Sequence, residues 1–175
     1  MFRRMLWVVS LSVLLGELTA CQRGEHKTAG IRISATMPWY SYVQAKLVEK
    51  VDKTGKPTFT FPVLLVYNKA GVLVYEGHDT AGNTDALAKL SSGELPFHVE
   101  AGAQLTTLID KIPEFQSRKS RLIEPHNMSA VSIFLESCHA CSMQEETITT
   151  MEQRLLAERV NLLMVHVLRP DWYYK

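Results

Sequence analysis

Two cysteines separated by two residues, in Cys138-His139-Ala140-Cys141, have the type and spacing for thiol–disulfide chemistry. A continuous apolar run, 130–135, precedes them and predicts a buried strand, and a helical apolar pattern follows through about Glu158. This order places the first cysteine at a helix N-terminus. Unpaired backbone N–H groups and the positive end of the helix dipole favour the thiolate there, and the thiolate is the nucleophile.

The positions of the two cysteines predict different roles. Cys138 is expected to attack, and Cys141, one helical turn later, to resolve the mixed disulfide and release the substrate. Protonated His139 is expected to tune the site by adding positive charge near Cys138. The carboxylates of Glu136 and Glu145, like that of Glu146, would act in the opposite direction if they lie close.

Other interpretations of the pair remain open. An inert structural disulfide needs only the two cysteines. A zinc site needs two more ligands. His126 and His166 are candidates, although the sequence does not show where they lie in the fold. Copper bound by the cysteines and a histidine is a further alternative. Covalent haem attachment needs a histidine where this chain has Ser142. We therefore expect neither a metal nor a cofactor.

The first residues predict export. Arg3 and Arg4 precede a short apolar stretch, 6–15, that fits the central segment of a secretory signal. Leu18-Thr19-Ala20-Cys21 resembles the lipobox of bacterial lipoproteins, although Glu17 departs from that pattern. The resemblance implies a signal peptide over 1–20, and lipidation of Cys21 that anchors the protein in a membrane. The alternative is a plain secretory signal or short membrane anchor with an incidental cysteine.

Export has consequences for the rest of the chain. A polar tether over 21–30 would keep the folded part close to the membrane, and Gln22 favours the outer membrane, facing the periplasm. In that compartment the two remaining cysteines can be oxidised. Removing Arg3, Arg4 and Glu17 leaves 17 basic and 17 acidic side chains, so no basic surplus indicates nucleic acid as a partner.

The remaining pattern alternates strand and helix signals, and 46% of the residues are hydrophobic, which is enough for a core. Predicted strands are 31–35, 63–67, 72–75, 130–135 and 160–168. One predicted helix begins at Pro38-Trp39 and ends at Gly55, and a second begins at a Thr84 cap. Two more cover 105–112 and 139–158. The polar stretch 114–129 predicts a linker or surface loop. The strands 63–67 and 72–75 flank a turn and predict a hairpin.

At this point the chain resembles the thioredoxin-like family. Residues 130–168 resemble its strand, active-site helix and following strand, and Phe61-Pro62 with the hairpin 63–74 resembles its cis-proline hairpin. The resemblance implies that Pro62 lies beside the Cys-x-x-Cys motif and helps present substrate backbone. The alternative is a proline that merely begins a strand.

The order of these parts differs from that of the family, because the hairpin precedes Cys138. Two arrangements explain this: one circularly permuted domain over 31–175, which we favour, or a degenerate first unit over 31–113 followed by a Cys-x-x-Cys unit over 126–175. We expect an α/β fold with a thioredoxin-like mixed sheet of four or five strands and helices on both faces.

The expected function is thiol:disulfide oxidoreductase activity on protein thiols and disulfides in the periplasm, with its direction left open. The alternative is an assembly or binding component of the envelope, in which Cys138 and Cys141 form a structural disulfide, or a copper- or zinc-binding envelope protein.

Overall fold

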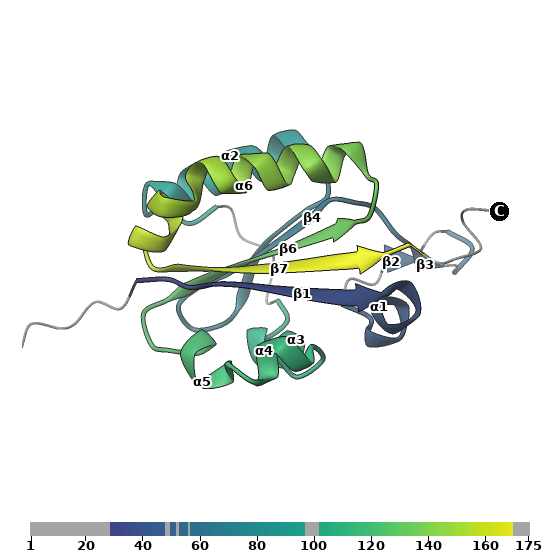
Figure 1. The fold of residues 1–175 in the computed structure, drawn as a ribbon, viewed down its shortest axis with the longest axis horizontal. Helices are drawn as coiled ribbons and strands as arrows, with labels where there is room; N and C mark the ends of the chain where they lie inside the picture. Colours follow the sequence, from purple (N-terminus) through teal and green to yellow (C-terminus); the bar gives the residue numbers. More distant parts are fainter. Residues whose placement is uncertain (1–28, 48–49, 52, 56, 97–101, 170–175) are drawn as a thin grey trace, which may run out of the picture.

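The computed structural model describes residues 29–47, 50–51, 53–55, 57–96 and 102–169. A five-stranded sheet in the order β1-β7-β6-β4-β5 forms its centre (Figure 1). The strands are β1 (Arg32–Pro38), β4 (Val63–Tyr67), β5 (Leu73–Gly77), β6 (Met128–Leu135) and β7 (Val160–Leu168). β1, β7 and β6 are parallel, whereas β4 is antiparallel to both β6 and β5. The predicted mixed α/β sheet is confirmed; Cys21 and the signal peptide lie outside the described residues.

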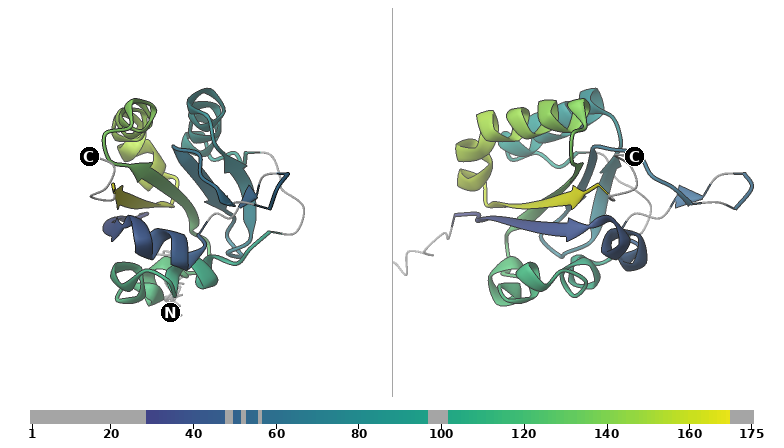
Figure 2. Two further views of the ribbon diagram at one scale, coloured as in Figure 1. Left: turned by 90° about the vertical axis from the view of Figure 1, so that its right-hand side faces the viewer. Right: turned by 45° about the vertical axis from the view of Figure 1, so that its right-hand side comes forward.

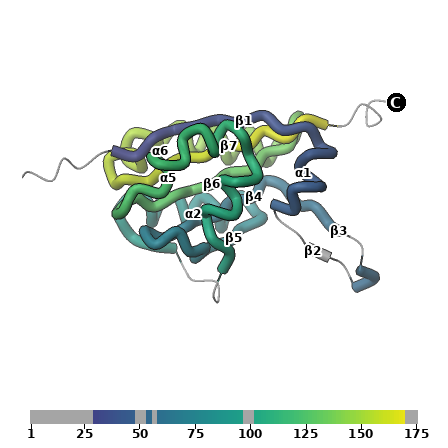
Figure 3. Tube along the Cα trace, turned by 90° about the horizontal axis from the view of Figure 1, so that it is seen from below, coloured from purple at the N-terminus to yellow at the C-terminus, as the bar shows by residue number. Residues whose placement is uncertain are grey.

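Helices cover both faces of this sheet. α2 (Thr80–Ser91) and α6 (His139–Ala157) lie side by side on one face, and α3 (Leu105–Ile109), α4 (Pro113–Gln116) and α5 (Lys119–Leu122) lie on the other (Figures 1 and 3). α1 (Trp39–Ala45) packs at the end of β1. Each face has its own apolar core.

The central strands are apolar on both sides because helices cover both faces. β4 is buried along its whole length, and β6 and β7 are buried nearly throughout. The edge strand β1 alternates instead, burying Ile33, Ala35 and Met37 and exposing the residues between them. This alternation gives the edge strand one solvated side.

The parallel strands define the two ends of the molecule. β1, β6 and β7 all end at the same edge of the sheet, where β4 begins, on the right of Figure 1. The chain enters the fold at the opposite end, where the backbone N–H of Gly30 donates to the carbonyl of Leu156 at 2.8 Å.

The helix predicted to run from Trp39 to Gly55 is much shorter than expected. α1 ends at Ala45, Lys46 takes the left-handed conformation with φ 46°, and β2 (Lys50–Val51) then pairs with β3 (Pro57–Thr58). This two-stranded ribbon projects from the body (Figure 2). Packing of α1 against the aromatic segment that follows β3 outweighs the helical pattern, as tertiary contacts often do.

The linker predicted over 114–129 is also wrong. α4 and α5 occupy its first half, and β6 begins at Met128, two residues earlier than predicted. Each short helix buries one large side chain, Phe115 or Leu122, and one residue per helix leaves no periodic pattern to detect.

The predicted Thr84 cap lies inside α2. Asp79 caps the helix instead, because its Oδ1 accepts the backbone N–H of Gly82 at 2.7 Å. Thr84 Oγ1 donates to the carbonyl of Thr80. Among the described residues, no helix combines the length and apolar character needed to cross a membrane.

Candidate functional site

A cleft lies at the end of the sheet where β6 and β7 finish. Its volume is about 260 Å³, and both cysteines line it. Carboxyl ends of parallel strands are a common place for ligand sites, because the chain turns away into loops and helices there. The other lining residues are Phe134, Leu135, Glu136, Ser137, Ser142, Glu145, His166, Val167 and Leu168.

Cys138 is the N-cap residue of α6. It has an extended backbone, and its Sγ accepts the backbone N–H of Cys141 at 3.2 Å. α6 has 19 residues, so the partial positive charge of its N-terminus is fully developed beside this sulfur. The predicted strand–cysteine–helix arrangement is present.

The two cysteines differ in exposure. Cys141 is 3% exposed and belongs to the core beneath α6, whereas Cys138 is half-buried at the cleft. Their sulfurs lie at disulfide-bonding distance, with the Cα atoms 5.2 Å apart. The Sγ of Cys141 also accepts the backbone N–H of Leu135 at 3.4 Å. A substrate therefore has access to Cys138, while Cys141 is shielded behind it.

Arg169 binds the turn that immediately precedes Cys138. Its Nε donates to the Glu136 carbonyl at 2.6 Å and its Nη2 to the Ser137 carbonyl at 3.3 Å, while its backbone N–H donates to Glu136 Oε2 at 3.1 Å. Ser137 has φ 58°, a left-handed conformation that non-glycine residues seldom adopt. Sequence reasoning missed Arg169, which is 31 positions beyond Cys138 and belongs to no motif.

Pro62 lies at the same end of the sheet. Val63 pairs with Ile133, so continuing this register places Pro62 opposite Phe134, a residue of the cleft. Pro62 is buried, and its peptide bond with Phe61 is cis. The role of Pro62 in presenting substrate stays a prediction.

A buried polar network joins this proline segment to the helix that carries the cysteines. Gln144 Nε2 lies 3.4 Å from the Val63 carbonyl and 3.4 Å from Ser132 Oγ, and it donates to both. Gln144 Oε1 accepts from Asn83 of α2 at 2.6 Å, and Asn83 Oδ1 accepts from Tyr75 at 3.2 Å. The sequence gives no signal for this network, because its members come from five separate elements.

Aromatic side chains anchor the residues before Pro62 to α1. The ring of Trp39 lies 5.1 Å from that of Phe59, and the ring of Tyr42 lies 5.5 Å from that of Phe61. Burial, with a smaller contribution from the charge of Glu76, raises the pKa of Tyr42 to about 12. A phenol with this pKa keeps its proton well above neutral pH.

A second side-chain cluster lies beside this segment. Thr60 Oγ1 and His78 Nδ1 are 2.8 Å apart, and His78 Nε2 is 2.6 Å from Glu76 Oε1. The imidazole therefore links the segment between β3 and Pro62 to the end of β5, which helps fix the position of that segment.

The predicted histidines are dispersed. His139 is exposed at the first position of α6 and is not among the cleft-lining residues. His166 lines the cleft and contacts Phe134, with ring centroids 5.4 Å apart. His126 precedes β6, at the far end of an eight-residue strand that spans about 26 Å. Within the described ranges, no three His, Cys, Asp or Glu residues cluster as a metal site.

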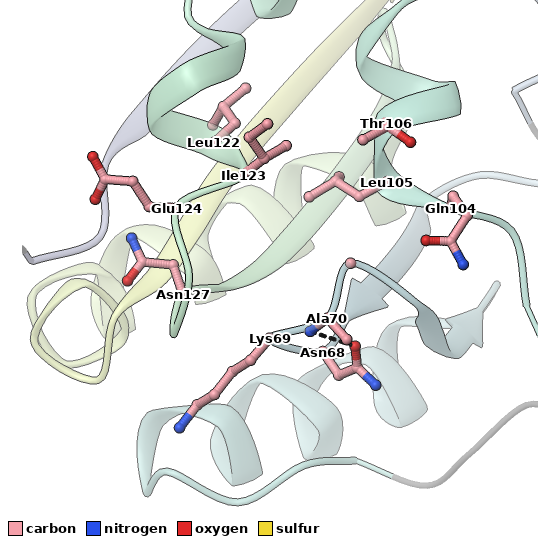
Figure 4. A pocket seen from close by; sticks show the side chains of 11 residues that line it. Asn68, Lys69, Ala70, Gln104, Leu105, Thr106, Leu122, Ile123, Glu124 and Asn127 are labelled. Carbon is pink, nitrogen blue, oxygen red and sulfur yellow. Dashed lines mark hydrogen bonds between the residues drawn. The ribbon is translucent and has the colours of Figure 1, made fainter.

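A smaller depression of about 100 Å³ lies at the opposite end of the sheet (Figure 4). The turn after β4 forms one wall, where Asn68 Oδ1 accepts the backbone N–H groups of Ala70 and Val72. Leu105 and Leu122 contribute to the other wall. No cysteine or histidine lines this depression, so it shares no chemistry with the cleft.

No protein-family model, curated protein or solved structure matches the chain.

Proposed function

We propose that this chain catalyses thiol–disulfide exchange on protein substrates through Cys138 and Cys141. The observation that carries the proposal is the arrangement of the two sulfurs. The accessible Cys138 caps a long helix and accepts a backbone N–H, whereas Cys141 is buried directly behind it. An inert staple needs no such difference in exposure.

The exchange transfers two electrons between the substrate and the cysteine pair. When Cys138 and Cys141 are a disulfide, a substrate thiolate attacks Cys138 Sγ, and the Cys141 thiolate leaves and takes up a proton. A second substrate thiol, after losing its proton, attacks the mixed disulfide and releases Cys138 as a thiolate, so the substrate is oxidised and the pair reduced. Reduction of a substrate disulfide follows the same steps in reverse.

The surroundings of the cleft suit a polypeptide substrate. Leu168, an exposed apolar residue, lines it beside the cysteines, and Met143, also exposed, lies two positions after Cys141. Such a surface offers contact area next to the reacting sulfur, and the Pro62 segment lies on the neighbouring strand β4.

The arrangement of the strands supports a permuted thioredoxin-like domain. The hairpin β4–β5 lies beside β6, the strand that leads into Cys138, and α2 packs against α6. These are the neighbours that the resemblance implies, although the hairpin comes first in the chain. Strands from 31–113 and from 126–175 also share one sheet, which favours one composite domain over two units.

We further propose that Cys21 is lipidated and anchors the protein in a bacterial envelope membrane, facing the periplasm. The described fold begins at Ala29, eight positions after Cys21, and enters at the end of the sheet opposite Cys138. β1 spans about 23 Å between these ends. An anchored molecule therefore presents the cleft away from the membrane. Mass spectrometry of the N-terminal peptide tests this: an unmodified Cys21 would refute the anchor.

The reduction potential of the Cys138–Cys141 pair tests the catalytic proposal. The full chain, purified in detergent, is equilibrated with reduced and oxidised glutathione, and the fraction of oxidised pair is measured. A value between about −120 and −270 mV is expected, because known exchange dithiols fall there. A value below about −300 mV indicates a structural disulfide and overturns the proposal.

A paired variant separates enzyme from scaffold. Replacing both cysteines, C138S/C141S, is expected to abolish exchange with a model protein disulfide and to reduce the free energy of unfolding only slightly, because the closed loop is very short. A large loss of stability would instead identify the pair as a staple. C141S alone should trap substrates on Cys138, since the resolving thiol is absent.

A further inference from the structure

The side chain of Arg169 binds the two carbonyl groups that immediately precede Cys138. Nε donates to Glu136 and Nη2 to Ser137, so the planar guanidinium uses two of its donors on one turn. Arg169 is partly buried and follows the last residue of β7. Its position is therefore fixed by the sheet rather than by a flexible loop.

This contact places a permanent positive charge on the peptide group that leads into Cys138. The Ser137 carbonyl belongs to the peptide group whose nitrogen is that of Cys138, so one peptide unit separates the guanidinium from the Cys138 backbone. The N–H of Cys138 donates to the Leu135 carbonyl at 3.2 Å, which closes the turn. Arg169 thus fixes both the path of the turn and the local field.

Other charged and titratable groups around Cys138 also affect the stability of its thiolate. Glu136 in the turn, Glu145 on α6 and His166 on β7 line the same cleft, and His139 begins α6. The Glu136 carboxylate accepts the backbone N–H of Arg169. The two carboxylates disfavour a thiolate at Cys138, and the positive charge of Arg169 opposes their effect.

We propose that Arg169 is a positioning residue of the redox site, which holds the turn before Cys138 and stabilises the Cys138 thiolate by its charge. This inference deepens the proposed exchange function and assigns to Arg169 the tuning role that the sequence suggested for His139. Coulomb attraction between the guanidinium and the Cys138 thiolate favours the anion, and the helix N-terminus adds to it.

The test compares three variants of the full chain. Arg169→Gln removes the positive charge and keeps a hydrogen-bond donor. Arg169→Lys keeps the charge and loses the planar guanidinium that binds two carbonyl groups. Arg118→Gln is the control, because it removes a positive charge on the other face of the sheet. The reduced proteins are alkylated with iodoacetamide between pH 4 and 9. The rate is followed by fragmentation mass spectrometry, which assigns the label to Cys138 or to Cys141 within the peptide that holds both.

Arg169→Gln is expected to slow alkylation of Cys138 at pH 6 by three- to tenfold and to move the rate profile to higher pH. Arg169→Lys should keep most of the wild-type rate, and Arg118→Gln all of it. In glutathione equilibrium, Arg169→Gln should favour the disulfide by up to about tenfold, which is about 30 mV toward more reducing values.

Two results would overturn the proposal. Equal losses in the glutamine and lysine variants would show that Arg169 only holds the turn, and an unchanged profile in Arg169→Gln would show that it contributes nothing. Thermal unfolding of each variant confirms that the compared proteins are folded. The alkylation profile is independent of catalysis, so it reports on Arg169 even if the wild-type potential falls below about −300 mV and the exchange function itself fails.

Discussion

The carboxamide of Asn83 donates a 2.6 Å hydrogen bond to Oε1 of Gln144, although the two residues are 61 positions apart. Both side chains are at most 1% exposed. The bond joins α2 to α6, the helix at whose N-terminus the two cysteines lie. Gly77 makes room for it, because a Cβ there would overlap Asn83 Oδ1 and the Tyr75 hydroxyl.

We predict that Asn83 and Gln144 are energetically coupled. Asn83→Ala and Gln144→Ala should each lower the free energy of unfolding by about 2–3 kcal/mol, because each leaves a buried partner unpaired. The double variant should lose about 1–2 kcal/mol less than the two single losses combined. Urea denaturation of the four proteins measures this coupling.

Asn161 provides the control for this cycle. It is equally buried, but it donates to the carbonyl of Leu122 at 3.3 Å, and its Oδ1 accepts the N–H of Ile31. Asn161→Ala should therefore be destabilising and yet additive with Gln144→Ala. Additivity of the Asn83 and Gln144 variants as well would refute a coupling through the hydrogen bond.

Continuous apolar runs and helical periodicity were sufficient to predict the strands and the main helix of the central sheet. β7 has the predicted bounds, and the hairpin β4–β5 and α6 follow the pattern within a few residues. β4 and β7 are continuous apolar runs because both of their sides are covered, whereas α6 repeats with the helical period because one side of it faces the sheet. α4 and α5 each bury one large residue and escaped prediction.

The candidate site was predictable only where it is local in sequence. Cys138 and Cys141 share a motif with the start of a helix, so their placement follows from spacing. Arg169 and Gln144 act through contacts with distant backbone carbonyls. Such contacts depend on the packing of several elements, which leaves no pattern along the chain.

Two buried serines of β6 should respond oppositely to alanine. Ser132 Oγ accepts from Gln144 at 3.4 Å, whereas Ser129 Oγ has no hydrogen-bond partner within the described part of the chain. Ser129→Ala should raise the free energy of unfolding by up to about 1 kcal/mol, because it removes an unpaired buried hydroxyl. Ser132→Ala should lower it by about 1 kcal/mol. Urea midpoints of the two variants measure the contrast, and equal signs would contradict it.

Ser137 should tolerate glycine and resist a β-branched residue. Its φ of 58° is a left-handed conformation that glycine adopts at no steric cost, whereas valine is strongly disfavoured there. Ser137→Gly should change the free energy of unfolding by less than about 1 kcal/mol, and Ser137→Val should lower it by about 1–2 kcal/mol. If chemical denaturation shows equal effects, the backbone of this turn does not constrain residue 137.

Alkaline pH should destabilise the fold through its buried tyrosines. Burial, and secondarily the charge of Glu76, raises the pKa of Tyr42 from 10.0 to about 12 and also raises the pKa of Tyr67. In the unfolded chain these phenols ionise near pH 10, while in the fold they keep their protons. Their contribution is therefore complete below pH 10 and is lost as pH rises from 10 towards 12, by about 1 kcal/mol per pH unit for each tyrosine.

Phenylalanine variants isolate the contribution of Tyr42. Tyr42→Phe keeps the ring contacts with Phe59 and Phe61, so its free energy of unfolding should fall less steeply between pH 10 and 11.5 than that of the wild type. Tyr40 is 70% exposed, so Tyr40→Phe should leave the slope unchanged. If both variants follow the wild-type curve in urea denaturation at each pH, Tyr42 does not contribute to the alkaline limb. A flatter slope in Tyr42→Phe alone would show that the aromatic cluster beside Pro62 holds a neutral phenol as part of its apolar packing.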